Sequence, residues 1–244
     1  MDCKSRFSWH LDESQPPAFS IDGRRIPGPA AQMATTLKPD KALIFRIVHR
    51  DNLPWMLEHG LHASNGDKHD PNYRNIGNVD LIGRRNHRRV RVGPGGTLND
   101  YVPFYFTPFS IMMYNIHTGY NVRQIPNEEI LIIVSSLVRI AELHIPFVFT
   151  DQHAYPAMAS YYTDLDDLKE VDWSLLNRRD FQHDPDDPGK KERYQAEALI
   201  WKYVPLEALL GICSCSAAVD AAVKAELTKR NLNVQSSMQP NWYF

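Results

Sequence analysis

The order of the apolar segments is the feature of this sequence that most limits its fold. Six segments rich in β-branched and aromatic residues predict strands, and the segments between them predict only a few helices, at irregular intervals. A doubly wound sheet would need strands and helices in regular alternation, so we expect an α+β fold. The expected strands are Ala42–His49, Tyr101–Ser110, Glu129–Ser136, Pro146–Ala154, Ala196–Pro205 and Ala208–Cys215, and the expected helices cover residues 52–60, 111–119, 164–173 and 217–231.

The chain divides into a short atypical segment and one long domain. Residues 1–40 are rich in proline, glycine and serine and show little periodicity, so we expect a flexible or loosely docked N-terminal extension. Residues 41–244 are long enough for a single domain. With 43% hydrophobic residues overall, this part of the chain can bury a core, which excludes general disorder. A long polar loop is expected at residues 63–78.

Cysteine content and hydropathy bear on the compartment. Three cysteines in 244 residues do not make a disulfide framework, which favours a reducing, intracellular setting. No run of about 18 apolar residues predicts a membrane span, and the first residues lack the apolar core of a signal peptide. We therefore expect a cytoplasmic protein with no membrane partner.

The strongest anomaly of composition is the run Arg84–Arg91, which holds five arginines in eight residues. Such a run is typical of phosphate binding, and a solvated surface explains it equally well. The whole chain has 27 Lys and Arg against 29 Asp and Glu, a net charge of −2. Net charge does not show where the charges lie. A basic patch on a mildly acidic chain is therefore stronger evidence for phosphate binding than a basic patch on a basic chain.

Other chemical candidates each have a simple structural explanation. Glu197 opens an apolar strand, where an exposed strand-end carboxylate is the simpler interpretation from position alone. Asp151 and His153 follow a strand and would commonly cap a turn. Cys213 and Cys215 have no second pair, and no histidine motif for zinc is present, so we expect no metal. The Walker A, GxGxxG and GxSxG motifs are absent.

Several segments together resemble the DarT family of DNA ADP-ribosyltransferase toxins. They occur in the family's order between residues 42 and 244: IFRIVHRDNLPWMLEHGL, IGRRNHRRV, DYVPFYFTPFSIMMY, PFVFTDQHA, RYQAEALIWKYVP and the closing WYF. The resemblance implies an ADP-ribosyltransferase fold, a split antiparallel sheet with peripheral helices around an NAD cleft. It also implies transfer of ADP-ribose from NAD to a base in single-stranded DNA, thymine or alternatively guanine, by a toxin that a DarG-type macrodomain antitoxin neutralises.

The resemblance also implies residue roles. Glu197 matches the family's catalytic glutamate, whose carboxylate stabilises the positive charge that develops on the ribose as nicotinamide leaves. Arg85 matches the second essential residue. An arginine is a poor general base, so we expect it to stabilise the base nitrogen as that atom loses its proton, and to orient the base.

The remaining expected contacts fall into two groups. Four residues would bind NAD, and five would meet the DNA backbone or base. Phe109 stands where many members of the family have an arginine, which removes a phosphate contact there. The segment from Tyr155 to Gln195 would select the base. The NAD group is Arg46, His49, Asn52 and Tyr105, and the DNA group is Arg84, Arg88, Arg89, Arg91 and His153.

Two other functions remain open from the sequence. The same NAD machinery could modify protein or RNA, with the arginine run meeting a different acceptor. A catalytically silent nucleic-acid-binding module would also explain the arginines, although it would leave Glu197 without a role.

Overall fold

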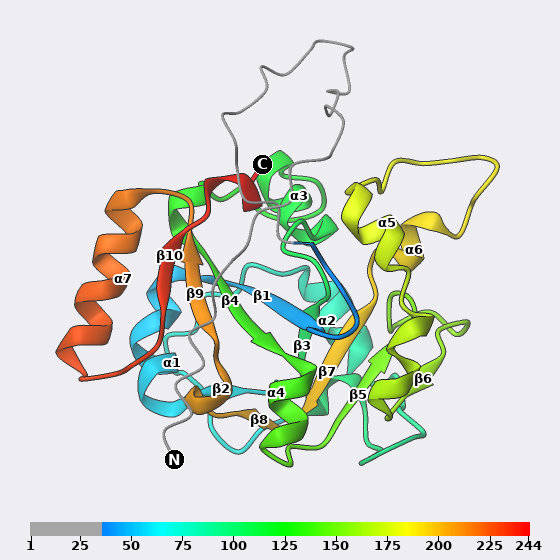
Figure 1. The fold of residues 1–244 in the computed structure, drawn as a ribbon, viewed down its shortest axis with the longest axis horizontal. Helices are drawn as coiled ribbons and strands as arrows, with labels where there is room; N and C mark the ends of the chain where they lie inside the picture. Colours follow the sequence, from blue (N-terminus) through cyan, green and yellow to red (C-terminus); the bar gives the residue numbers. More distant parts are fainter. Residues whose placement is uncertain (1–35) are drawn as a thin grey trace, which may run out of the picture. The chain divides into compact units, whose positions relative to one another are not determined.

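The structure, a computed structural model, describes residues 36–244 and contains a sheet of eight strands in the order β10-β9-β4-β1-β3-β7-β5-β6. All neighbours are antiparallel except β9 and β10 (Figure 1). The strands are β1 (Leu43–His49), β3 (Tyr101–Tyr105), β4 (Ile130–Ser136), β5 (Phe147–Thr150), β6 (Tyr161–Tyr162), β7 (Glu197–Trp201), β9 (Gly211–Ser214) and β10 (Ser236–Met238), and a separate pair joins β2 (Leu61–His62) to β8 (Tyr203–Val204).

The centre of the sheet follows from the two most apolar segments. β1 and β4 pair over seven residues, from Leu43 opposite Ser136 to His49 opposite Ile130. Every residue of β4 is buried, and Arg46 is the only residue of β1 that is not. A strand that is buried on both faces must be apolar on both faces, which explains why these segments are continuous apolar runs.

The sheet is split between β1 and β3. These strands share a single residue pair, Phe45 with Tyr105, whereas β3 and β7 share five. Pro103, in the middle of β3, has no N–H to donate toward β1. Its carbonyl accepts a hydrogen bond from Arg46 Nη1 at 2.9 Å instead of a backbone bond. The expected α+β fold with a split, mostly antiparallel sheet is therefore confirmed.

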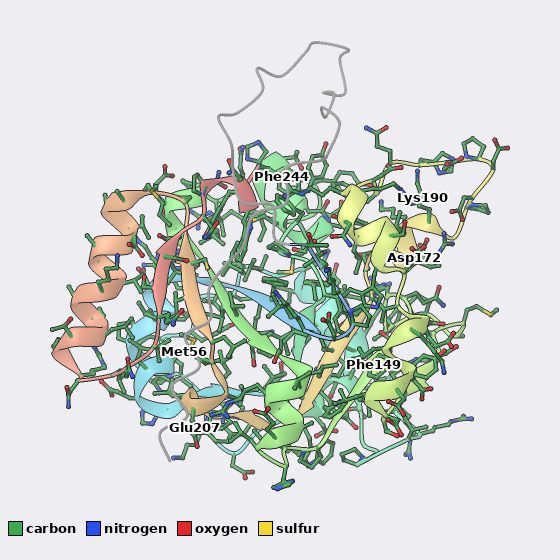
Figure 2. All side chains as sticks on the ribbon, in the orientation of Figure 1. Met56, Phe149, Asp172, Lys190, Glu207 and Phe244 are labelled. Atoms are coloured by element: carbon green, nitrogen blue, oxygen red, sulfur yellow. The ribbon has the colours of Figure 1, made fainter. Side chains whose placement is uncertain are left out.

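Helices pack around this sheet. α7 lies along β9 and β10, and its buried residues Val219, Val223 and Leu227 recur at helical spacing on one face (Figure 1). Near α3, the ring of Phe244 lies 5.3 Å from that of Tyr114 (Figure 2). The helices are α1 (Leu53–His59), α2 (Val79–Arg85), α3 (Ile111–Thr118), α4 (Leu137–Glu142), α5 (Trp173–Arg178), α6 (Lys190–Arg193) and α7 (Ala217–Lys229), with 3-10 turns at Arg50–Asn52, Leu98–Asp100, Asn127–Glu129, Leu165–Glu170, Leu206–Ala208 and Pro240–Trp242.

One helix was not expected, and one expected helix differs. Residues 79–85 form α2, which the arginine-rich composition concealed, although Asn78 accepts a hydrogen bond from Leu81 N as an N-cap. The expected helix at residues 164–173 is instead a 3-10 segment, and α5 begins after the N-cap Asp172.

The first 35 residues, where most of the expected N-terminal extension falls, lie outside the described residues. The described part begins close to the core: Leu37 is buried, and its backbone N–H and C=O both bond the side chain of Asn177. Within residues 36–244, no helix is long and apolar enough to cross a membrane.

Candidate functional site

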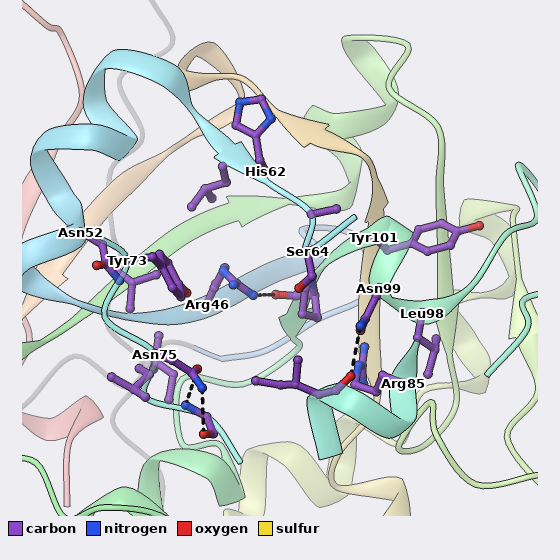
Figure 3. Close-up of a pocket in the computed structure, with 18 of the residues that line it drawn as sticks. Arg46, Asn52, His62, Ser64, Tyr73, Asn75, Arg85, Leu98, Asn99 and Tyr101 are labelled. Atoms are coloured by element: carbon purple, nitrogen blue, oxygen red, sulfur yellow. Dashed lines mark hydrogen bonds between the residues drawn. The ribbon is translucent and has the colours of Figure 1, made fainter. Parts of the chain in front are cut away.

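A cavity of about 450 Å³ opens where β1 and β3 diverge. Its wall includes residues of both strands, the long segment 63–78 and α2 (Figure 3). The expected polar loop at 63–78 contains no helix or strand, and it forms one side of the cavity. The cavity is large enough for a dinucleotide-sized molecule.

Glu197 lies in the wall of this cavity with only 2% of its surface exposed. The interpretation as an exposed strand-end residue was wrong, because β7 is an interior strand between β3 and β5. A carboxylate in such a place needs partners, and the carboxylate of Glu197 has two hydrogen bonds and a salt bridge. Arg85 Nη1 donates to Oε1 at 3.2 Å and lies 3.0 Å from Oε2, and Ala154 N donates to Oε1 at 2.9 Å.

Arg85 reaches Glu197 from the last turn of α2. It is buried, with 8% of its surface exposed. The helix is held against the sheet side of the cavity by Asn99, whose Nδ2 donates to the carbonyl of Ile82 at 3.0 Å (Figure 3). The structure therefore brings together two residues that are far apart in the sequence.

Two buried guanidinium nitrogens in this wall have no hydrogen-bond partner among the described residues. They are Nη2 of Arg85 and Nε of Arg46. An unpaired buried donor is costly, so it marks a place where a ligand oxygen would bind favourably. Both side chains line the cavity, and their charges suit phosphate or ribose oxygens.

His153 completes the surroundings of Glu197. Its Nε2 lies 3.7 Å from Glu197 Oε1. Burial lowers the pKa of His153 below its usual value, and this outweighs the opposing effect of the nearby Glu197 carboxylate. His153 is therefore neutral at pH 7 and does not compete with Arg85 as a cation.

Tyr105 stands opposite Glu197 in the β3–β7 ladder and also lines the cavity. Directly paired residues of neighbouring strands place their side chains on the same face. Burial, followed by the charge of Glu197, raises the pKa of Tyr105. The phenol therefore stays protonated and can donate a hydrogen bond into the cavity.

Asn52 and His49 differ from their expected roles. Asn52 lines the cavity, but its Oδ1 accepts from Arg74 N at 2.8 Å and its Nδ2 donates to Arg74 O at 3.0 Å, so it holds the 63–78 segment in place. His49 does not line the cavity. It lies three residues from Arg46 along β1 and so faces the other side of the sheet. Its Nδ1 accepts from Asp51 N at 3.1 Å, and its Nε2 lies 3.0 Å from Glu129 Oε2.

The arginine run separates into three environments. Arg85 is buried at the cavity, and Arg88 is half-buried with its Nη2 donating to Pro156 O at 3.0 Å. The other three, Arg84, Arg89 and Arg91, are exposed. The Arg84 guanidinium also lies 5.6 Å from the ring centroid of Tyr155.

Within residues 36–244, no cluster of three or more metal-ligating side chains occurs. The thiol of Cys213 is buried, and burial raises its pKa to about 11. The thiol of Cys213 is therefore protonated at neutral pH and is a poor nucleophile.

Sequence reasoning missed several cavity residues. Asn99, Tyr73 and His62 all line the cavity (Figure 3), and the ring of His62 lies 4.7 Å from that of Tyr203. Only Tyr73 carried a local signal, as an aromatic residue inside an otherwise polar segment. The role of Asn99 depends on a contact with α2, which no local pattern encodes.

Comparison with known proteins gives consistent matches. The model of the family described as "ssDNA thymidine ADP-ribosyltransferase, DarT" matches residues 45–244. A DNA ADP-ribosyl transferase of Escherichia coli O127:H6 (strain E2348/69 / EPEC) is 52% identical over 216 residues, which cover 88% of this chain and 99% of that protein.

Solved structures from Thermus sp. 2.9 agree with this match. DarT in complex with ADP-ribosylated ssDNA superposes with a TM-score of 0.78 at 33% identity, and the match covers 84% of this chain and 98% of that one. DarT in complex with NAD+ gives a TM-score of 0.73 at 33% identity, with 84% and 99% covered.

Proposed function

Since this chain belongs to the DarT family of single-stranded-DNA ADP-ribosyltransferases, we propose that its cavity binds NAD and that Glu197 and Arg85 catalyse transfer of ADP-ribose to a DNA base. The buried Arg85–Glu197 pair in the cavity wall, with its nitrogen and oxygen 3.0 Å apart, is the observation that carries this assignment. We propose thymine as the modified base, as the description of the matching family names thymidine.

NAD fits the residues of the cavity. It is the donor substrate and supplies ADP-ribose, with nicotinamide as its leaving group. Arg46 Nε and Arg85 Nη2 are buried donors without partners, and Tyr105 adds a protonated phenol. Arg46 and Tyr105 therefore hold the donor, while Asn52 contributes by fixing the 63–78 segment around it. We do not retain His49 as an NAD contact.

The role of Glu197 follows from its surroundings. Its carboxylate is held in place before any ligand binds, by Arg85 and by the N–H of Ala154. A preorganised negative charge beside the ribose stabilises the positive charge that develops as the glycosidic bond breaks, without reorganisation at that moment. This interaction is stronger in the transition state than in the ground state, which is what acceleration requires.

Arg85 would act both in the loss of nicotinamide, through Glu197, and in the attack by the base. Nη1 contacts the carboxylate of Glu197, and Nη2 is free to donate a hydrogen bond to an atom that develops negative charge. The thymine ring nitrogen bonds to the ribose carbon as the bond to nicotinamide breaks, and its proton leaves to solvent. A fixed guanidinium lowers the energy of the negative charge that develops on the base. His153, neutral and beside Glu197, borders the position of the base.

The DNA strand would follow the exposed arginines Arg84, Arg89 and Arg91. Arginine neutralises backbone phosphates, and a single strand presents its bases without the cost of unpairing. We propose that the protein acts in the cytoplasm, on DNA of the cell. As in other toxins of this family, a macrodomain antitoxin of the DarG type would reverse the modification.

One assay tests this proposal. The protein is incubated with labelled NAD and single-stranded oligonucleotides of mixed sequence, with protein and RNA acceptors in parallel. We expect label on DNA and free nicotinamide, and mass spectrometry of the oligonucleotide identifies the modified base. Label on protein or RNA alone, or equal transfer by a Glu197→Ala variant, would contradict the proposal.

A further inference from the structure

Ala154 links the carboxylate of Glu197 to a side chain that the sequence did not single out. Ala154 is fully buried. Its backbone N–H and its carbonyl both form hydrogen bonds. Its N–H donates to Glu197 Oε1 at 2.9 Å, and its carbonyl accepts a hydrogen bond from the Tyr161 hydroxyl. A single residue therefore connects the phenol of β6 to the carboxylate at the start of β7.

Hydrogen bonds also hold the backbone on both sides of Ala154. His153 N donates to Glu192 O at 2.9 Å, and Arg88 Nη2 donates to Pro156 O at 3.0 Å. Residues 153–156 are thus held by four hydrogen bonds, which involve His153 N, Ala154 N, Ala154 O and Pro156 O. Only two residues further on, the side chain of Met158 is 83% exposed.

The protonation state of Tyr161 supports its role as a donor. Burial raises the pKa of Tyr161, and the nearby Arg88 opposes this only in part. The hydroxyl therefore keeps its proton at neutral pH and donates to the Ala154 carbonyl. A phenolate could only accept a hydrogen bond and would repel that carbonyl.

We propose that Tyr161 and Arg88 are positioning residues that act through the backbone of residues 154–156 to hold the Glu197 carboxylate in its reactive orientation. This inference rests on the proposed role of Glu197. It also changes the assignment of Arg88, which we expected to bind DNA phosphates. The guanidinium of Arg88 is half-buried and already donates to a protein carbonyl, unlike that of the exposed Arg89.

Tyr161 and Arg88 would affect the rate through the position of the Glu197 carboxylate. A displacement of about 1 Å in a catalytic group costs roughly 10²-fold in rate. Glu197 Oε1 takes one of its two hydrogen bonds from a backbone N–H, and that N–H moves with the loop that carries it. Removing the Tyr161 hydroxyl leaves the Ala154 carbonyl buried without a partner, so the loop must shift to satisfy it.

The first test compares Tyr161→Phe with Tyr162→Phe. Tyr162 is the neighbouring residue of β6. Its ring stacks on Phe149 at 5.3 Å, and its hydroxyl has no hydrogen-bond partner among residues 36–244, so it is a matched control. For Tyr161→Phe we expect kcat for nicotinamide release to fall about tenfold, with KM for NAD within twofold of the unchanged chain. Tyr162→Phe should match the unchanged chain in both constants.

The second test separates positioning from DNA binding. Arg88→Ala should lower kcat and leave the salt dependence of the KM for single-stranded DNA unchanged. Arg89→Ala should change that salt dependence. Arg88→Lys, which can still reach a single carbonyl, should recover part of the lost kcat. If Tyr161→Phe does not fold, the Arg88 variants decide the question.

The two proposals fail in different ways. Wild-type kcat in both Tyr161→Phe and Arg88→Ala overturns the positioning role. A change in the salt dependence of DNA binding in Arg88→Ala also overturns it. Full activity in Glu197→Gln instead overturns the proposed function itself.

Discussion

One guanidinium nitrogen of Arg85 serves both carboxylate oxygens of Glu197, at 3.2 Å from Oε1 and 3.0 Å from Oε2. The second terminal nitrogen of Arg85 is buried without a partner. Arg85 therefore fixes the carboxylate with one terminal nitrogen, and the other is the one that we propose contacts the substrates.

Glu197→Gln should abolish transfer of ADP-ribose. The amide keeps the size of the side chain but removes the negative charge, and loss of one preorganised electrostatic group costs roughly 10²–10³-fold in kcat. Unfolding should also become easier by about 3 kcal/mol, because the buried Arg85 loses its counter-charge. Rates of nicotinamide release and thermal unfolding measure both effects. Glu207→Gln, at an exposed position, is the control and should change neither.

Acidification should destabilise the protein through His153. Its pKa in the folded state is lowered by burial, so the unfolded chain binds a proton more readily than the folded one. The stabilisation is complete at pH 7, above the ordinary value of 6.5, and is lost as pH falls through the lowered pKa. His153→Asn should reduce the dependence of the free energy of unfolding on pH below the ordinary histidine value of 6.5. His62, whose pKa burial also lowers, should account for part of the slope that remains. An unchanged slope would contradict this assignment.

Replacing Arg89 and Arg91 together by alanine should weaken the binding of single-stranded DNA and make it less sensitive to salt. Each lost phosphate contact reduces the slope of log K against log salt by about 0.7 for a single strand. Binding of a labelled oligonucleotide at several salt concentrations measures this slope. NAD affinity should stay the same, since both arginines are exposed and neither lines the cavity. Arg123→Ala, at an exposed arginine outside the run, should leave the slope as it is.

Asn52→Ala should raise the KM for NAD roughly tenfold, with a smaller effect on kcat. The change removes the two hydrogen bonds to the backbone of Arg74 that hold the 63–78 segment, and a typical hydrogen bond contributes about 0.5–1.5 kcal/mol. Steady-state kinetics with varied NAD separate the two constants. Asn233→Ala, at an exposed position, provides the comparison. Equal KM values in the two variants would show that the segment needs no such anchor.

Sequence reasoning was most successful where the local pattern carries the information. Buried strands such as β1 and β4 are recognisable from continuous apolar runs, and their ends were predicted within one residue. The helix α2 was missed because an arginine run resembles a solvated segment, and because Gly83 weakens the helical pattern. Its N-cap Asn78 was the available signal.

Residues of the site were predictable only in part, for a physical reason. A match to a family motif points to Glu197 and Arg85, but the direction of a side chain depends on strand pairing and on neighbouring elements. His49, expected at the NAD site, does not line the cavity, because it faces the other side of β1 and contacts Glu129 and Asp51. Arg88 and Tyr161 act through backbone atoms of another segment, and such contacts leave no trace in local composition.

The divergence of β1 from β3 has a consequence for solvent exchange. Central strands are usually the slowest part of a protein to exchange their amide hydrogens for deuterium, because the ladder protects both sides. Here β1 is paired along its whole length with β4 but at a single residue with β3. Its amides that face β3 should exchange faster than those that face β4. Exchange at these amides should become slower when NAD binds in the cavity. Their exchange rate therefore reports NAD binding directly.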